Sequence, residues 1–546
     1  MMKRAPLSGK RALHVSLRGA VVLIVSLSMC LWMYSRTSSA AENRASLHLD
    51  SVHTLNYSGR GDMSGFVKHP LGPQDFSAFE EWLNPNNLNL TEIWWSPKDD
   101  LHPPLYMALV HVLRVSGFDF QTAFLAVNLL GLVSLAVGIL ITCWRDRRSL
   151  VQSCLALLFV GLTPAAFATS QEARGWMLCA GLSMVSMSLL SSATISVLRN
   201  EVIRRSRLVA IVVSAALTLM VETSFFLGFA AWVFASQLLT MPRRRSLRQW
   251  KISIKIAIPV VALWLASVPG SFRHFSYATS MKSESTSTWS LFAPHLNTEI
   301  SAWFLRRMGD LWQIGGDRRI TYFLLAASGT FLLLGQVRNS LPSRELRAGG
   351  ELEKPLTHTF VVGLTGSFWL VIYFGLFSFE YLPTYAVGFK YILPFGVLLL
   401  FGIFDGVTRL RAGTAGALLL ALIMAYHAEA LDLPGQSQGE IVAEMVTADG
   451  IVVVGSEWDT ANLMYAIHQV DEYPYPDVFR FSSPAVWREE ACTVFPRGSR
   501  VAVFAKRPPW GEGIEGLVRS GQVSTEARVL GVLEFGEVAV VNACAS

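Results

Sequence analysis

Four short polar segments interrupt an otherwise apolar chain, and the first of them contains Asp50. Asp50 lies in the segment 46–54, shortly after the first long apolar run. A carboxylate beside an apolar segment can serve as a general base, because it can accept the proton of a weakly nucleophilic hydroxyl group. The structural alternative is a solvated surface charge. Which role holds depends on where the other polar segments lie.

The second polar segment reads HPPLY and lies at the start of a predicted helix, at 102–106. Its two prolines suit a first helical turn, where backbone N–H groups have no partner within the helix. The segment ends the long polar stretch in which Asp50 lies. The structural alternative is that His102 only caps the helix.

The third and fourth segments place charges beside apolar helices. Gln171, Glu172 and Arg174 lie between two apolar blocks, and Lys390 and Tyr391 open another block. Charges next to hydrocarbon need partners or a polar cavity. Lys390 is suited to pair with a lipid phosphate. The structural alternatives are an interfacial loop and a lysine that extends to the membrane surface.

The composition indicates a membrane protein. Charged residues make up 16% of the 546 residues and hydrophobic residues 52%, whereas an ordinary soluble domain has about 25% charged residues. The net charge of +6 comes from short runs of Lys and Arg beside apolar blocks. This pattern is typical of membrane topology signals rather than of a nucleic-acid-binding surface.

The apolar blocks predict about eleven transmembrane helices, since a span needs about 20 residues. The stretch 207–240 is either two short helices that meet at Glu222 or one long block. The first run, followed by Ser38 to Ala41, also has the form of a signal peptide, but a retained helix is favoured because many spans follow. The blocks cover approximately 19–34, 120–143, 149–168, 176–197, 207–222, 224–240, 252–270, 320–337, 357–378, 390–408 and 413–429.

Basic residues gather in alternate connections, which predicts that these connections and the N-terminus are cytoplasmic. The first exterior loop then covers 36–101, and all four polar segments and the C-terminus lie on the exterior side. The basic connections are 145–148, 199–207, 243–251, 338–354 and 409–411.

The predicted fold is an all-α polytopic membrane domain, 1–429, followed by a small exterior soluble α/β domain, 430–546. Residues 428–546 are too polar to span a membrane, and their β-rich runs are bounded by polar segments. Strands are predicted at 451–455, 501–505 and 537–541, with a helix at 460–469.

The cysteines divide into two groups. Cys492 and Cys544 lie in the predicted exterior domain, where oxidation is permitted, so we predict a disulfide between them. Two separate thiols are the alternative. The other four lie in or beside apolar blocks, and we interpret them as small buried side chains. They are Cys30, Cys143, Cys154 and Cys179.

The order of the four segments resembles the C-type glycosyltransferases that use polyprenyl-phosphate sugars, in particular bacterial relatives of protein O-mannosyltransferases and the lipid A aminoarabinose transferase. The resemblance covers roughly 15–430. Its motifs are SLHLDSVHT, HPPLY, QEAR and KYILP, at 46–54, 102–106, 171–174 and 390–394. Members of the family carry an acidic residue where Ser51 stands and an arginine where Lys390 stands.

This resemblance implies an inverting transfer of a sugar from a polyprenyl-phosphate donor to a lipid, glycan or protein acceptor at the non-cytoplasmic face. It implies that Asp50 is the general base and that Arg174 and Lys390 stabilise the leaving phosphate. His102, Tyr106, Gln171, Glu172 and Tyr391 are further candidates for substrate binding. Ser51 and Lys390 depart from the family pattern. Two alternatives therefore stay open, which are an altered donor or acceptor and a non-catalytic relative.

Other functional classes of membrane protein would show different sequence features. A transporter or flippase of a lipid-linked saccharide would show repeats and charges within its spans, and Glu222 is the best such charge. A structural anchor for the C-terminal domain would need one span. The sequence predicts membrane lipids as partners, no nucleic acid and no cofactor. No ligand spacing demands a metal, although use of a divalent metal stays open. The predicted location is a bacterial inner membrane.

Overall fold

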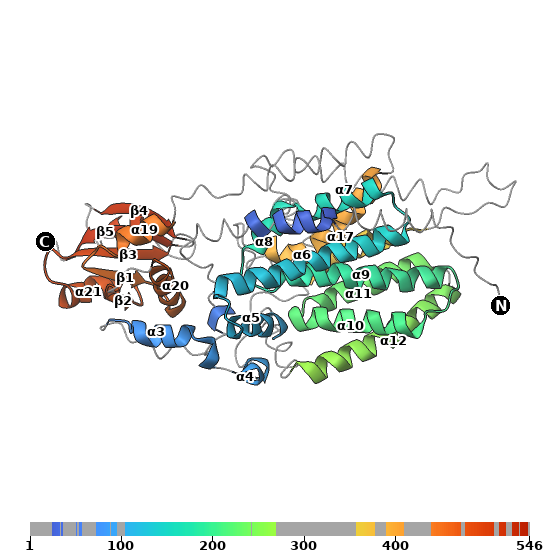
Figure 1. Cartoon of the computed structure of the whole chain (residues 1–546), viewed down its shortest axis with the longest axis horizontal. Coiled ribbons are helices and arrows are strands. Elements are labelled where there is room, and N and C mark those ends of the chain that lie inside the picture. Colours follow the sequence, from blue (N-terminus) through green and yellow to red (C-terminus); the bar gives the residue numbers. More distant parts are fainter. Residues whose placement is uncertain are drawn as a thin grey trace, which may run out of the picture.

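The computed structural model describes a bundle of apolar helices with a smaller α/β unit at one end (Figure 1). We call the second part, within 438–543, the sheet unit. The described residues are 24–32, 34–36, 51, 54–56, 73–87, 89–95, 104–241, 243–268, 356–376, 389–408, 438–470, 475–506, 513–519, 527–533 and 536–543.

The helices of the bundle follow the predicted apolar blocks. Within the described residues, three helical segments are long and apolar enough to cross a membrane: 120–145, 176–198 and 245–267. The blocks predicted at 320–337 and 413–429 lie outside the described residues, so the number of spans stays a prediction. The bundle comprises α6 (Phe120–Arg145), α7 (Leu150–Gly161), α8 (Pro164–Ser170), α9 (Trp176–Leu198), α10 (Arg205–Val221), α11 (Phe225–Thr240), α12 (Arg243–Ser267), α16 (His358–Leu376) and α17 (Phe389–Thr408).

Two helix boundaries bear on the predictions. The block 149–168, predicted as one span, is divided into α7 and α8. Pro164 begins α8, and the hydroxyl of Thr163 accepts a 3.2 Å bond from Ala166 N. This break has a physical reason, because proline at a helix start needs no N–H partner. The stretch 207–240 is two helices with Glu222 at their junction, which was one of its two predicted forms.

Small residues allow α6 and α9 to pack closely. A Cβ atom on Gly181 would lie 2.0 Å from the carbonyl oxygen of Gly131, so no larger side chain fits there. Farther along the same pair, Thr142 Oγ1 donates to Ser188 Oγ at 2.6 Å. In a membrane the lipid tails are as apolar as the side chains, so the hydrophobic effect does not drive helices together. Close packing of small side chains and hydrogen bonds between helices stabilise the association instead.

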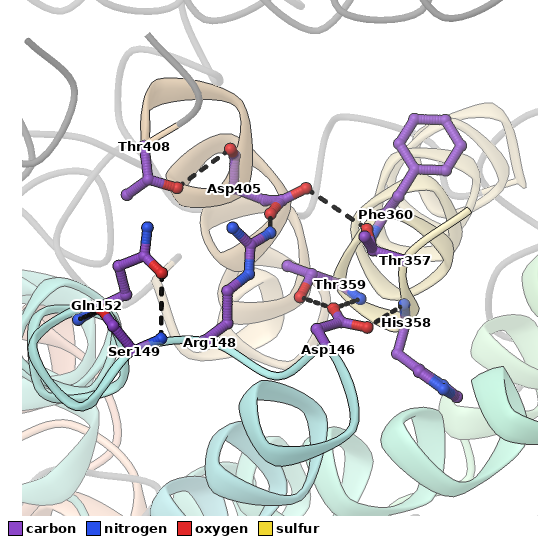
Figure 2. Close-up of polar contacts among 10 residues, drawn as sticks. All are labelled: Asp146, Arg148, Ser149, Gln152, Thr357, His358, Thr359, Phe360, Asp405 and Thr408. Carbon is purple, nitrogen blue, oxygen red and sulfur yellow. Dashed lines mark hydrogen bonds and ion pairs between the residues drawn. The ribbon is translucent and has the colours of Figure 1, made fainter. Parts of the chain in front are cut away.

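Charged side chains join α16 and α17 to the turn between α6 and α7 (Figure 2). The two carboxylate oxygens of Asp146 accept bonds from His358 N at 2.7 Å and Thr359 N at 2.8 Å, at the start of α16. Arg148 forms an ion pair with Asp405 of α17, whose side chain is 4% exposed. These contacts fix the last two described helices of the bundle at the end that carries the basic connections.

The sheet unit contains a five-stranded mixed sheet with the order β2-β1-β3-β5-β4. β1 pairs in parallel with β2 and β3, whereas β5 pairs antiparallel with β3 and β4. Three strands and α20 occupy segments predicted from the sequence; β2 and β4 do not. The elements are α19 (Gln438–Met445), β1 (Gly450–Val454), α20 (Glu457–His468), β2 (Val478–Phe481), α21 (Pro484–Val494), β3 (Arg500–Lys506), α22 (Gly513–Arg519), β4 (Arg528–Leu533) and β5 (Gly536–Asn542).

The cysteines are placed as follows. Cys492, in α21, is disulfide-bonded. Cys544, its predicted partner, lies outside the described residues, so the pairing stays a prediction. The four cysteines of the bundle segments are free, and three of these are buried while Cys154 is partly buried.

The first loop contributes short helices that lie beside both parts of the molecule. They are α3 (Phe76–Leu83), the 3-10 turn η1 (Pro85–Asn87) and α4 (Leu90–Trp95), and α5 (Leu105–Val115) follows the loop. Figure 1 shows α3 next to the sheet unit and α5 at the same end of the bundle. Gln74 N donates a 2.8 Å bond to Val478 O on β2, the outer strand of the sheet. The first loop and the sheet unit therefore share one end of the bundle, opposite the basic connections.

Candidate functional site

The structure describes half of the predicted site residues with their side chains. Tyr106, Gln171, Glu172 and Arg174 are all buried. Asp50 and His102 lie outside the described residues. Lys390 and Tyr391 belong to the first turn of α17, where only the backbone is described.

Asn128, on α6, joins two of the predicted segments. Its side chain is 1% exposed and accepts a 3.3 Å hydrogen bond from the hydroxyl of Tyr106. Its Nδ2 group donates to the carbonyl oxygens of Ser170 and Glu172, at 2.9 Å and 2.8 Å. One buried amide therefore holds α5 against the loop between α8 and α9.

That loop has a tight backbone, which the neighbouring helices hold in place. Arg174 N donates to Glu172 O at 2.8 Å, so the chain turns within the QEAR segment. Gly175 follows in close contact, because a Cβ atom there would lie 3.0 Å from Val221 Cγ1 and 3.3 Å from Tyr106 Cβ. The turn orders Glu172 and Arg174 in a buried environment.

The first loop is attached to the same turn at Ala173. Ala173 N donates a 3.0 Å bond to the hydroxyl oxygen of Ser51, and the hydroxyl of Thr54 donates to Ala173 O. Ser51, Thr54 and Ala173 are 2%, 0% and 0% exposed. Both backbone polar groups of Ala173 are thus bonded by residues of the 46–54 segment. Ser51, which departs from the acidic residue of the family, has a structural role at this contact.

Asn56 extends the attachment to α3. Its Oδ1 accepts a 3.0 Å bond from the indole N–H of Trp82, and both side chains are buried. Buried amides and indoles need such partners, because an unpaired polar group inside a protein costs about 1–3 kcal/mol. The segment 51–56 is therefore held at the QEAR turn and at α3.

Charges act on Tyr106 within this region. Burial raises the pKa of the Tyr106 phenol well above its usual value, the positive charge of Arg174 lowers it and the negative charge of Glu172 raises it. Both charges therefore lie near the phenol. The region combines a cation, a carboxylate, a phenol and an amide at one end of the bundle, which is suited to bind a polar group presented at the membrane face.

Glu222 also lies in this part of the bundle. It follows the last residue of α10, and its Oε1 accepts a 3.2 Å bond from Ser224 N. The sequence suggested a charge within a span. The structure places Glu222 at the junction of α10 and α11, which was the other predicted form of this stretch.

Two contributions to the site were not predicted. Asn128 had one available signal, which is an amide well inside the apolar block 120–143. The bonding role of Ser51 had none, because its partner lies 122 residues away in the sequence. Among the described residues, no group of three or more His, Cys, Asp or Glu side chains could hold a metal.

Comparisons with known proteins found similarity to solved structures. No family model matches the sequence, and no curated protein does. The apo structure of ArnT from Cupriavidus metallidurans is similar over 97% of this chain and 98% of its own, with 11% identity and a TM-score of 0.49. The structure of the same protein bound to undecaprenyl phosphate is similar over 96% of this chain and 97% of its own, with 12% identity and a TM-score of 0.46.

At this identity, the function of the chain has to be argued from its own residues.

Proposed function

We propose that the chain is an inverting glycosyltransferase that moves a sugar from a polyprenyl-phosphate donor to an acceptor at the non-cytoplasmic face of a membrane. The contact between Ser51, Thr54 and Ala173 carries this proposal. It joins the segment that contains the candidate base to the segment that contains the candidate cation. Asn128 adds Tyr106 of the HPPLY segment to the same group. Three motifs that the resemblance treats as one site are thus neighbours.

The proposed reaction is a single displacement at the anomeric carbon of the donor. The acceptor oxygen forms a bond to that carbon while the bond to the phosphate oxygen breaks. Asp50 takes the proton of the acceptor hydroxyl, and the product lipid leaves as polyprenyl phosphate. Attack from the side opposite the phosphate inverts the configuration.

Arg174 has the role of stabilising the departing phosphate, because negative charge accumulates there in the transition state. Its burial supports this role, since a charge-assisted contact is stronger away from water. Lys390 approaches the same phosphate from α17 in this proposal. His102, Tyr106, Gln171, Glu172 and Tyr391 are proposed to orient the sugar and the lipid head. The acceptor is a lipid, glycan or protein of the cell envelope.

The proposed location is the bacterial inner membrane, with the N-terminus in the cytoplasm and the sheet unit outside. The distribution of charge supports this orientation. Seven Arg residues of two basic connections lie at the end of the bundle opposite the candidate site, at 145, 147, 148, 199, 204, 205 and 207. Basic residues are retained on the cytoplasmic side of membrane proteins.

A transporter or flippase remains the alternative activity. Its main support in the sequence was Glu222 as a charge within a span, and that support is weaker because Glu222 lies at a helix junction. A non-catalytic relative is the other alternative. The Ser51 contact weakens one reason for it, because the exchanged residue makes a buried hydrogen bond rather than leaving a vacant position.

The test uses the purified full chain in detergent with a polyprenyl-phosphate sugar labelled in the sugar. Incubation with cell-envelope lipid, glycan and protein fractions should move the label to one fraction and release polyprenyl phosphate in equal amount. A parallel measurement in liposomes follows movement of the labelled lipid across the bilayer. Movement across the bilayer with no transfer to any fraction would favour the flippase instead.

A further inference from the structure

We infer that the sheet unit is a positioning element for the first exterior loop and that it acts through α3. The contacts form a continuous path from β2 to the QEAR turn. The effect on turnover rests on the proposed function, whereas the effect on the order of the loop does not. The path has three parts, at the sheet unit, within α3 and at Asn56.

The first part joins the sheet unit to α3. Gln74 N donates to Val478 O at 2.8 Å, so the chain just before α3 bonds to the free edge of β2. The ring of Phe76 stacks on Tyr475, with centroids 4.5 Å apart. Tyr475 OH is in turn 3.0 Å from Nδ1 of His468, at the end of α20. Backbone and aromatic contacts therefore both hold α3 against the sheet unit.

The second part runs along α3. The ring of Phe79 meets His468 edge-on, with centroids 6.2 Å apart, and lies 5.5 Å from the ring of Trp82. Phe79 and Trp82 are 0% and 2% exposed. A second contact supports this helix from the bundle side, because Arg114 of α5 donates to Leu83 O. The eight residues of α3 are thus held between the sheet unit and α5.

The third part reaches the candidate site. The indole N–H of Trp82 donates to Asn56 Oδ1 at 3.0 Å, and Asn56 lies two residues after Thr54. Thr54 and Ser51 bond to Ala173 of the QEAR turn. The segment 51–56 therefore has one support from the bundle and one from the sheet unit. Asp50 precedes this segment directly in the sequence.

A loop that is held by two sets of contacts opens less often than a loop that is held by one. Surface loops open locally with low free energy unless buried contacts hold them. Loss of the Trp82 bond removes one support but leaves Arg174 and Asn128 in place. The expected consequence is a lower turnover with the Michaelis constant for the donor unchanged, because the base is less often positioned while the phosphate site is intact.

The experiment uses three variants of the full chain. Trp82→Phe keeps one aromatic ring but removes the N–H donated to Asn56 together with the second ring of the buried indole. Tyr475→Ala removes the stacking partner of Phe76 at the sheet unit. Trp487→Phe is the matched control, since the ring of Trp487 packs on Phe481 and Phe495 within the sheet unit, with centroids 5.0 Å and 6.1 Å apart. Thermal unfolding identifies any variant that fails to fold. If Tyr475→Ala does not fold, Phe76→Leu replaces it, because it removes the other ring of the stacked pair.

Hydrogen–deuterium exchange of the peptide 48–58 is measured together with sugar transfer. Both test variants should raise exchange about fivefold, the factor that corresponds to one hydrogen bond of about 1 kcal/mol. Turnover should fall by a similar factor, and the control should match the parent. Exchange equal to that of the parent in both test variants would overturn the inference. So would a changed donor Michaelis constant at constant turnover.

The two proposals fail in different ways. If exchange responds as expected but the parent transfers no sugar to any fraction, the positioning role stands and the proposed function is wrong. If the parent transfers sugar and the test variants match it in exchange, the proposed function stands and the positioning role is wrong.

Discussion

Ala173 N donates a 3.0 Å hydrogen bond to the hydroxyl of Ser51, although the two residues lie 122 positions apart in the sequence. With the Thr54 bond to Ala173 O, this contact makes the QEAR turn a support for the first loop. It also gives Ser51 a physical role, because its hydroxyl supplies the acceptor for a buried N–H group without placing a charge there.

Ser51→Ala should destabilise the folded protein and lower turnover. The change leaves the buried N–H of Ala173 without its acceptor, which costs about 1–3 kcal/mol. Thermal unfolding in detergent and the rate of sugar transfer measure the two effects. Ser51→Thr is the control, because it keeps the hydroxyl. A Ser51→Ala protein with the stability and turnover of the parent would show that this bond has no such role.

Asn128→Leu should impair donor use more than Ser51→Ala does. Leucine has a similar volume but makes none of the three bonds to Ser170 O, Glu172 O and Tyr106 OH. The QEAR turn then loses the group that orders Arg174, and the Michaelis constant for the donor should rise about tenfold, equivalent to one charge-assisted contact.

The control for this prediction lies on the same helix. Ser134→Ala removes a hydroxyl that bonds to Leu130 O within α6. Its Michaelis constant should equal that of the parent. If Asn128→Leu also keeps the constant of the parent, Asn128 does not order the donor site.

Arg148→Met should destabilise the bundle by about 3 kcal/mol, because it leaves Asp405 charged and buried. Asp405→Asn should cost less, since the Arg148 side chain is 15% exposed and that of Asp405 only 4%. The double variant should be more stable than the sum of the two single changes implies. Additive losses in thermal unfolding would contradict a direct pair between these residues.

Cys492 should be paired with Cys544 in the purified protein. Under denaturing conditions without reductant, a thiol reagent should then label the four bundle cysteines and neither of these two. A closed loop of about fifty residues stabilises the folded unit by roughly 4 kcal/mol in the chain-entropy description. Labelling of Cys544 in the unreduced protein would rule the pair out.

Much of the helical bundle could be predicted because the length of each apolar run is a local property of the sequence. The blocks at 120–143 and 176–197 correspond to α6 and α9 within two residues. The break before Pro164 was missed, because an apolar run continues on both sides of it. β2 was missed because its four residues, VFRF, are too few to show alternation.

The site was harder to predict than the bundle. The motifs predicted Tyr106, Glu172 and Arg174 as site residues by order and spacing, and their roles stay predictions. The structure joins Tyr106 through Asn128 to the turn that contains the other two. The residues that hold the site in place could not be predicted, because Asn128, Ser51 and Trp82 bond to partners that are distant in the sequence. A serine or a tryptophan in a loop has the same local pattern whether or not it bonds to a distant backbone.

Asp50→Asn tests the central claim most directly. The substitution keeps the size of the side chain and removes its basicity, so the folded protein and its affinity for the donor should be retained. Turnover in the labelled-sugar assay should fall by about 10²–10⁴-fold, as expected for the loss of a general base. Turnover within a few-fold of that of the parent would contradict the account, because the chain would then transfer sugar without Asp50.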